Sequence, residues 1–308
     1  MNKYPSAELI QEVAIELGVE PSFVEKDWYA VKVLKLISEN LFDDICPVFS
    51  GGTSLSKGYG LIQRFSEDLD FKVKAATAKN RAECKVFRQS IIDLIDGEDC
   101  FTVDHDNIIK RDGSKFFAFN IGYPVSHALD HSLRPSLKLE MRFQAIPLAS
   151  EAREITSFVS QLTDEGHEAL VECISPVETA ADKFSALMWR IQGRDRTAEE
   201  SSTKNDPTMI RHLHDFCALK ALAKQDERFV PLLIDTFNDD LGRGNGPKDI
   251  TLNQAIDQTL AILEQEDRQY RFEYDKFVAA MSYADDDAKI TYDQALAAFK
   301  EAATFLLK

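Results

Sequence analysis

The spacing of apolar residues changes along the chain and separates predicted helices from predicted strands. Apolar residues recur three and four positions apart in Ala7–Leu17 and Ser22–Leu36, which predicts two helices that each bury one face. Strict alternation follows in Glu67–Lys74 and Leu133–Phe143, which predicts strands with one buried face. The short apolar run Cys46–Ser50 predicts a further, buried strand. The first half of the chain therefore predicts a sheet covered by helices.

Further elements extend this predicted sheet. A helix is predicted over Lys79–Ile95, ending at Gly97, where a glycine commonly closes a helix. Strands are predicted at Phe101–Asp106 and Lys115–Tyr123, joined by a turn at Arg111-Asp112-Gly113. The polar stretch Ser160–His167 predicts a surface connection.

The second half of the chain reads as helical. Ser175 and Glu178 form a predicted capping box with Pro176 at the first helical position. The helix that follows carries a buried stripe, namely Val177, Ala180, Ala181, Phe184, Leu187, Met188 and Ile191. Residues 193–207 contain almost no apolar side chain and predict a mobile loop. We therefore predict an α/β domain at residues 1–174 and a helical domain at 175–308 that contributes to a site between them.

Composition indicates a globular protein of the cytoplasm. Hydrophobic residues make up 44% and charged residues 29% of the chain, and no apolar run approaches the roughly 18 residues of a membrane span. The first residues lack the apolar core of a signal peptide, so a cytoplasmic location with no membrane partner is expected. Five widely spaced cysteines argue against both a disulfide framework and a zinc ribbon.

The formal net charge of −16 argues against non-specific binding to duplex nucleic acid, which needs a basic surface. The charge is uneven, however, because the stretch Thr53–Ile92 holds eight basic and four acidic residues. Helical geometry also places Lys183, Arg190 and, if the helix continues past Gly193, Arg194 in one band beside the buried stripe. We predict that these two basic groups guide one polyanionic end to the protein, although solvated lysines would give the same pattern.

Candidate chemistry begins where the Cys46–Ser50 strand meets Gly51 and Gly52. Glycines allow a tight turn and a close approach of backbone to ligand. Thr53 or Ser54 is then predicted to cap a helix, whose first N–H groups form an anion site beside two hydroxyls. This arrangement predicts a cradle for a triphosphate.

Two carboxylates follow on the next strand. Asp68 and Asp70 share one face and lie about 7 Å apart along it. Their repulsion is typically relieved by a bound Mg²⁺, which prefers hard oxygen ligands. A Gly-Gly turn alone, or a D-x-D strand alone, is more often an ordinary turn or a solvated strand edge. Their combination in one short unit predicts a nucleotide and metal site.

The segments GGTSL and RFSEDLDF together resemble the nucleotidyltransferase superfamily, and specifically the AbiEii/AbiGii type of bacterial toxin. The resemblance implies a DNA polymerase β-like nucleotidyltransferase fold, with a mixed sheet flanked by helices and a C-terminal helical domain. It implies that Gly52 and Thr53 hold the phosphates of an NTP, and that Asp68 and Asp70 hold Mg²⁺.

Weaker matches implicate three further residues. LKLEMRF resembles the family segment that supplies a third metal carboxylate, which implies this role for Glu140. Lys183 matches the family's K-x-x-A-L helix and implies a contact with the nucleotide. Asp215 matches an acid of the R-D-L-Y-D-L segment, whereas His212 stands where the first aspartate is usual. Asp68, Asp70, Lys183 and Asp215 are the predicted catalytic residues.

Structural alternatives remain for these matches. Glu140 can equally be an exposed strand residue paired with Lys138 or Arg142, and Arg211 with Asp215 can be a surface ion pair. The segment EKDWY resembles a helix found ahead of the glycine motif in the same family, yet its lysine and aspartate can be no more than a surface pair.

The sequence thus predicts a Mg²⁺-dependent nucleotidyltransferase and, by resemblance, a type IV toxin that transfers NMP from an NTP to an RNA acceptor such as the tRNA 3′ end. The antitoxin would be a separate protein that acts without a stable complex. Two alternatives use the same motifs, namely a small-molecule nucleotidyltransferase of the aminoglycoside type and a non-catalytic nucleotide-binding regulator.

Overall fold

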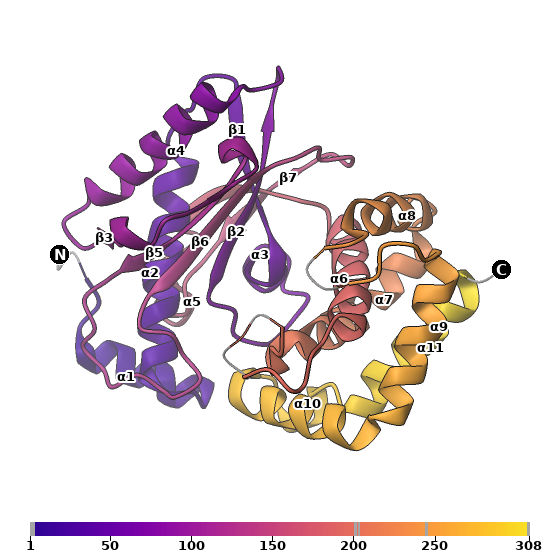
Figure 1. The fold of residues 1–308 in the computed structure, drawn as a ribbon. Coiled ribbons are helices and arrows are strands. Elements are labelled where there is room, and N and C mark those ends of the chain that lie inside the picture. Colours follow the sequence, from indigo (N-terminus) through magenta and orange to yellow (C-terminus); the bar gives the residue numbers. More distant parts are fainter. Residues whose placement is uncertain (1–3, 200–201, 203, 244–245, 307–308) are drawn as a thin grey trace. The chain divides into compact units, whose positions relative to one another are not determined.

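The computed structural model describes residues 4–199, 202, 204–243 and 246–306. The chain forms two compact units, Met1–Ser175 and Pro176–Lys308. The first unit contains the sheet, and the second is helical (Figure 1).

The first unit is built on one mixed sheet with the strand order β3-β5-β6-β2-β1-β8-β7, and β4 pairs with β5. In its centre, β2 lies antiparallel to β1 and parallel to β6. The strands are β1 Ile45–Ser50, β2 Asp68–Ala75, β3 Thr102–Val103, β4 Ile109–Arg111, β5 Phe116–Gly122, β6 Leu137–Phe143, β7 Glu151–Ile155 and β8 Ala169–Cys173. The mixed sheet predicted from the sequence is confirmed.

Helices cover both faces of this sheet. The helices are α1 Ala7–Leu17, α2 Pro21–Ser38, α3 Gly51–Lys57, α4 Arg81–Asp96 and α5 Phe158–Thr163. Figure 1 shows α2 and α4 on one side of the sheet and α3 on the other. The main core lies under α2 and α4 and includes Leu69, Phe71 and Val73 of β2. Because side chains alternate along a strand, Asp68 and Asp70 point away from this core.

Several predicted boundaries in this unit are wrong. Only Thr102–Val103 of the predicted strand Phe101–Asp106 is extended, and a 3₁₀ turn, His105–Asn107, replaces its end. β6 begins at Leu137 rather than Leu133. The predicted connection Ser160–His167 overlaps α5, whose N-terminus is capped by the Ser157 side chain, and β7 was not predicted. Short polar elements such as these depend on partners distant in sequence, so local spacing does not reveal them.

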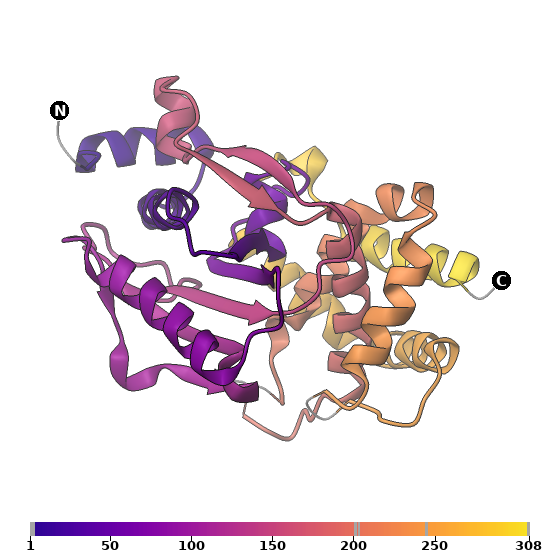
Figure 2. The same cartoon turned by 90° about the horizontal axis from the view of Figure 1, so that it is seen from above.

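The second unit is a helical bundle around α6. Its helices are α6 Pro176–Gln192, α7 Arg211–Gln225, α8 Phe229–Asp240, α9 Leu252–Gln265, α10 Asp267–Met281 and α11 Tyr292–Leu306, with 3₁₀ turns at Pro207–Ile210 and Asp286–Ala288 (Figure 2). The buried ring of Phe184 stacks on Phe299 at 4.5 Å and meets Phe216 edge-on at 4.9 Å between centroids. The predicted stripe of α6 is therefore the core of this unit. No described helix of either unit is long and apolar enough to cross a membrane.

Candidate functional site

The glycine turn lies directly beside one predicted metal ligand. Gly51 has φ 76°, in the left-handed region, and a Cβ at this position would collide with the Asp70 carboxylate. A Cβ on Gly52 would lie 2.7 Å from Nη2 of Arg64 and 3.0 Å from Oγ of Ser66. Gly51 therefore requires glycine for both conformational and steric reasons, whereas a side chain at Gly52 would have to displace the end of the Arg64 side chain. The Asp70 carboxylate lies directly against the turn.

The predicted capping role of Thr53 and Ser54 is wrong. Helix α3 already begins at Gly51, and Ser50 occupies the N-cap without a side-chain hydrogen bond. The Thr53 hydroxyl instead donates to the backbone carbonyl of Asp68 at 2.5 Å, and Ser54 is buried. Ser50 likewise donates from Oγ to the carbonyl of Asp70 at 3.0 Å. The Thr53 and Ser50 hydroxyls fix the backbone of β2 against the turn. The predicted contacts of Thr53 and Ser54 with phosphate stay predictions.

Strand register brings the predicted carboxylates onto neighbouring strands. Asp70 lies opposite Glu140 of β6 and opposite Ser50 of β1, whereas Asp68 lies opposite Lys138. Paired strands are about 4.8 Å apart, so Asp70 and Glu140 are near neighbours on one face. Glu140 therefore neighbours Asp70, and its predicted role as a third metal carboxylate stays a prediction.

These carboxylates have cationic partners. Nη2 of Arg134 donates to Oδ1 of Asp68 at 2.6 Å, and the Lys138 ammonium pairs closely with Glu140. Across the described residues, no three His, Cys, Asp or Glu side chains converge as a metal-binding group. Mg²⁺ usually takes only one or two carboxylates and completes its shell with water and substrate phosphates. The hard oxygens beside the glycine turn fit such an ion.

Lys26 of α2 is the buried anchor of this region. Its side chain has no exposed surface, pairs closely with Glu67 and donates to the carbonyl of Arg134 at 2.6 Å. Burial lowers the pKa of Lys26, although the Glu67 carboxylate opposes this effect. The interpretation of Lys26 and Asp27 as a surface pair is therefore wrong.

Asp27 and Glu25 hold two other segments. Oδ1 of Asp27 lies 2.5 Å from Nζ of Lys57 at the end of α3, and Oδ2 accepts the backbone N–H of Phe158 at 2.8 Å. Burial raises the pKa of Asp27, and the Lys57 ammonium counteracts the rise. Glu25 accepts the backbone N–H of Ser126 at 2.9 Å. The E-K-D segment is thus an internal framework of charges, which a single sequence could not distinguish from a solvated helix face.

The predicted pair in the helical unit is also internal. Nζ of Lys183 on α6 lies 2.9 Å from Oδ2 of Asp215 on α7, and Asp215 is fully buried. Arg211 pairs with Asp206 at 3.5 Å, so the proposed surface pair of Arg211 and Asp215 is wrong. Lys183 and Asp215 join two helices, and their predicted catalytic roles stay predictions.

His212 is an unusual neighbour of this pair. It is buried, and neither ring nitrogen has a hydrogen-bond partner in the described part of the chain. Burial lowers its pKa well below the usual 6.5, and the charges of Lys183, Arg211 and Arg190 lower it further against the opposing effect of Asp215. The imidazole is therefore neutral at physiological pH.

Several members of the two predicted basic groups are buried or paired with acids. Arg194 makes a two-pronged pair with Glu273 at 2.7 and 2.8 Å, and Arg190 lies 3.8 Å from Asp206. Within Thr53–Ile92, four of the basic residues are buried, namely Lys57, Arg64, Lys72 and Arg88. Three other basic residues of that stretch are exposed, namely Lys74, Arg81 and Lys85. The predicted guidance of a polyanionic end therefore stays a prediction.

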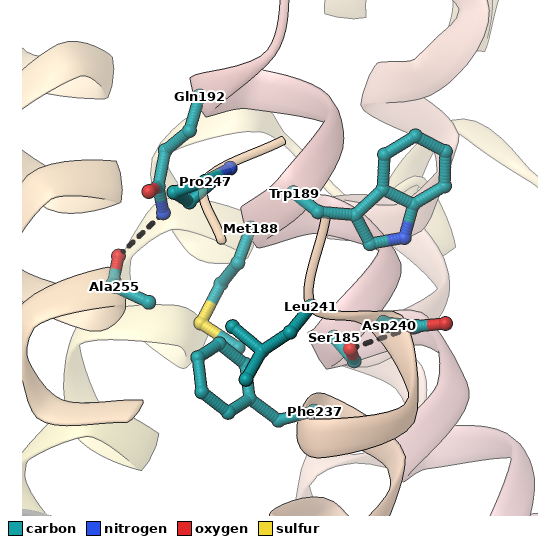
Figure 3. A pocket seen from close by; sticks show the side chains of 9 residues that line it. All are labelled: Ser185, Met188, Trp189, Gln192, Phe237, Asp240, Leu241, Pro247 and Ala255. Carbon is teal, nitrogen blue, oxygen red and sulfur yellow. Dashed lines mark hydrogen bonds between the residues drawn. The ribbon is translucent and has the colours of Figure 1, made fainter. Parts of the chain in front are cut away.

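A small pocket in the helical unit contains none of the predicted site residues. Figure 3 shows apolar side chains from α6, α8 and α9 around it, with two hydrogen bonds on its wall. Ser185 donates to Asp240 at 2.8 Å, and Gln192 donates to the carbonyl of Ala255 at 2.9 Å. Burial raises the pKa of Asp240 despite the nearby Arg243 charge.

Comparison with known families identifies the chain. Residues 32–302 match the family model described as the nucleotidyl transferase AbiEii toxin of type IV toxin–antitoxin systems. The chain belongs to the AbiEii family. It is therefore a nucleotidyltransferase, and membership implies a nucleotide substrate and a cognate antitoxin. The match spans both units of this AbiEii protein.

A solved structure shares the fold of this AbiEii protein. MenT4, a nucleotidyltransferase toxin from Mycobacterium tuberculosis, aligns with a TM-score of 0.51 and 18% identity, over 98% of this chain and 99% of that chain. The comparison with curated protein sequences gave no match. The expected resemblance and the nucleotidyltransferase fold are confirmed.

We predict that Lys26→Met destabilises the protein by roughly 3 kcal/mol, because removal of one partner leaves Glu67 without its buried cation. Urea unfolding measures the change. Lys35→Met is the matched control, since Lys35 lies 3.8 Å from Glu39 on the exposed surface of the same helix and such pairs contribute at most about 1 kcal/mol. Equal effects of the two substitutions would contradict the anchoring role.

We predict that His212 makes the protein less stable as the pH falls below 6.5. The unfolded chain takes up a proton at its usual pKa, whereas the folded imidazole has a lowered pKa and resists protonation, so acid favours unfolding. His212→Asn should flatten the dependence of the unfolding free energy between about pH 7.5 and pH 5.5. His131→Asn, at an exposed histidine, is the control, and an unchanged slope in His212→Asn would refute the prediction.

Proposed function

We propose that this protein transfers NMP from an NTP to a hydroxyl acceptor with Mg²⁺ as cofactor, and that the acceptor is an RNA end such as the tRNA 3′ end. The observation that carries the reaction is the position of Asp70, which lies against the Gly51 turn and opposite Glu140. Carboxylates beside a glycine turn suit a metal-bound triphosphate.

Residues of the first unit would bind the metal ion, admit the phosphates and position the carboxylates. Asp68 and Asp70 would hold Mg²⁺, with Glu140 as the neighbouring carboxylate. Bound Mg²⁺ would neutralise phosphate charge and favour deprotonation of the acceptor hydroxyl. Gly51 and Gly52 would let the phosphates approach the backbone. The Ser50 and Thr53 hydroxyls keep the carbonyls of Asp70 and Asp68 in place, so the carboxylates are held before substrate arrives.

The RNA acceptor is supported by chemistry and by the family, which consists of toxins. A single-stranded RNA end offers a free hydroxyl and unstacked bases that can stack on aromatic side chains. The neutralised arginines of the helical unit offer no broad basic face, so we expect weak binding with little affinity for duplex DNA. The antitoxin is proposed to be a separate protein that forms no stable complex.

The metal assignment predicts that Asp70→Asn lowers the rate of transfer by at least about 100-fold, because a metal-binding charge is lost while the side-chain volume is kept. Incorporation of labelled NMP with Mg²⁺ measures the rate. Asp112→Asn is the control, since Asp112 is an exposed acid that pairs with Arg142 of β6 at 3.4 Å. A rate near that of the wild type in a folded Asp70→Asn protein would exclude the proposed role of Asp70.

The acceptor assignment predicts that labelled nucleotide is transferred to intact tRNA and not to tRNA that lacks its 3′ end. Each NTP is incubated with Mg²⁺ and tRNA, truncated tRNA or aminoglycosides, and products are separated by size. Label on the drug alone would support the small-molecule alternative. Binding of NTP without transfer to any acceptor would support the non-catalytic regulator.

A further inference from the structure

Four charged side chains link the buried interior of α2 to the carboxylate face of β2. Lys26 pairs with Glu67, and Arg134 joins Glu67 to Asp68. Arg134 donates from Nε to Oε1 of Glu67 at 2.7 Å and from Nη2 to Oδ1 of Asp68 at 2.6 Å. Its backbone N–H also donates to Glu67 at 3.1 Å. One guanidinium therefore bridges two consecutive carboxylates.

Exposure rises along this series of four side chains. The exposed fraction is 0% for Lys26 and 10% for Glu67, but 29% for Asp68 and 42% for Arg134. Lys26 is therefore fixed in the interior of the unit. Arg134, the most exposed of the four side chains, is accessible to solvent and to ions. The two contacts of Arg134 are consequently unequal, because Glu67 is held by Lys26 and by the backbone of residue 134.

We propose that Arg134 is a resident counter-ion of the metal site, which neutralises Asp68 in the metal-free protein and gives it up when a divalent cation binds. Arg134 then remains on Glu67, whose position Lys26 fixes. Arg134 and Lys26 are positioning residues in this scheme, because they act through Asp68 and Glu67. The inference rests on the proposed Mg²⁺ site.

A counter-ion at this position reduces the repulsion among the carboxylates of the site. Asp68, Asp70 and Glu140 share one face and would repel one another without nearby cations. Burial alone would lower the pKa of Arg134, but Asp68 and Glu67 raise it above its usual value, so the guanidinium stays charged. A divalent cation on Asp68 repels this guanidinium, and Arg134 loses one ion pair while the other holds it nearby. The same interaction makes Arg134 a competitor of the metal.

The competition predicts a gain of metal affinity when Arg134 is neutralised. A unit charge about 5 Å from a divalent ion opposes its binding by about tenfold even in a water-like dielectric. Arg134→Gln should therefore bind Mn²⁺, an oxygen-preferring substitute for Mg²⁺, about tenfold more tightly than the wild type in the absence of nucleotide. Titration of free Mn²⁺ by electron paramagnetic resonance measures this affinity on the full chain.

Two further variants identify the cause. Arg142→Gln removes a positive charge from β6, where Arg142 lies opposite Lys72 in the register and pairs with Asp112. It should leave Mn²⁺ affinity within about twofold, since Arg142 lies four residues along β6 from Lys138, the residue opposite Asp68, and salt screens charges at such separations. In the Asp68→Asn background, Arg134→Gln should give no gain, because the competing pair is already absent. Arg134 is partly exposed, and thermal unfolding verifies that each variant is folded.

The outcomes separate this inference from the proposed function. Mn²⁺ binding that needs Asp70 but is unchanged or weakened in Arg134→Gln would overturn the counter-ion role and leave the metal site intact. An equal gain of Mn²⁺ affinity in Arg142→Gln would mean that the loss of any nearby positive charge has this effect. That result would also overturn the counter-ion role of Arg134. Absence of Mn²⁺ binding in every folded variant, with transfer unaffected in Asp70→Asn, would overturn both.

Discussion

The approach of the Asp70 carboxylate to the backbone of Gly51 is the constraint on which the candidate site depends. It requires a residue without a Cβ at the end of β1, a positive φ at that residue, and a carboxylate on the neighbouring strand β2. The hydroxyls of Ser50 and Thr53 strengthen this arrangement by binding the carbonyls of Asp70 and Asp68. A strand, a turn and a strand are thereby held as one rigid unit, which suits a site that must hold charged groups at fixed distances.

Placing several carboxylates on one face is costly unless cations lie close by. The first unit meets this requirement with Arg134 and Lys138, each in direct contact with a carboxylate of the group. Behind Arg134, the buried Lys26 neutralises Glu67. The charge balance of the carboxylate face therefore includes a fully buried lysine of α2.

The helical unit uses paired charges in a different way. Lys183 with Asp215 joins α6 to α7, and Arg194 with Glu273 joins the segment after α6 to α10. Lys183 and Arg194, two cations that the sequence offered to a polyanion, are thus engaged within the helical unit. Because charged hydrogen bonds of this kind are short and directional, they fix helix packing rather than provide a general electrostatic field.

The sequence by itself determined the fold class and the residue types of the candidate site, because both follow from patterns among residues close together in the chain. Alternation in Asp68–Ala75 places Asp68 and Asp70 on one face whatever the rest of the chain does. A Gly-Gly turn between an apolar strand and a helix is equally local, as is the apolar stripe of α6. The motif around them sufficed to identify the family that the full chain confirms.

Only the tertiary structure decided which charges are solvated. Glu25, Lys26 and Asp27 are consecutive on a helix and point about 100° apart, so each needs a partner from a different segment. Those partners, at residues 126, 67 and 57, are far away in sequence. The same holds for the register that sets Glu140 beside Asp70, and for the burial of His212. These contacts form when segments distant in sequence pack together. The spacing of residues within one segment does not specify which distant segment it meets.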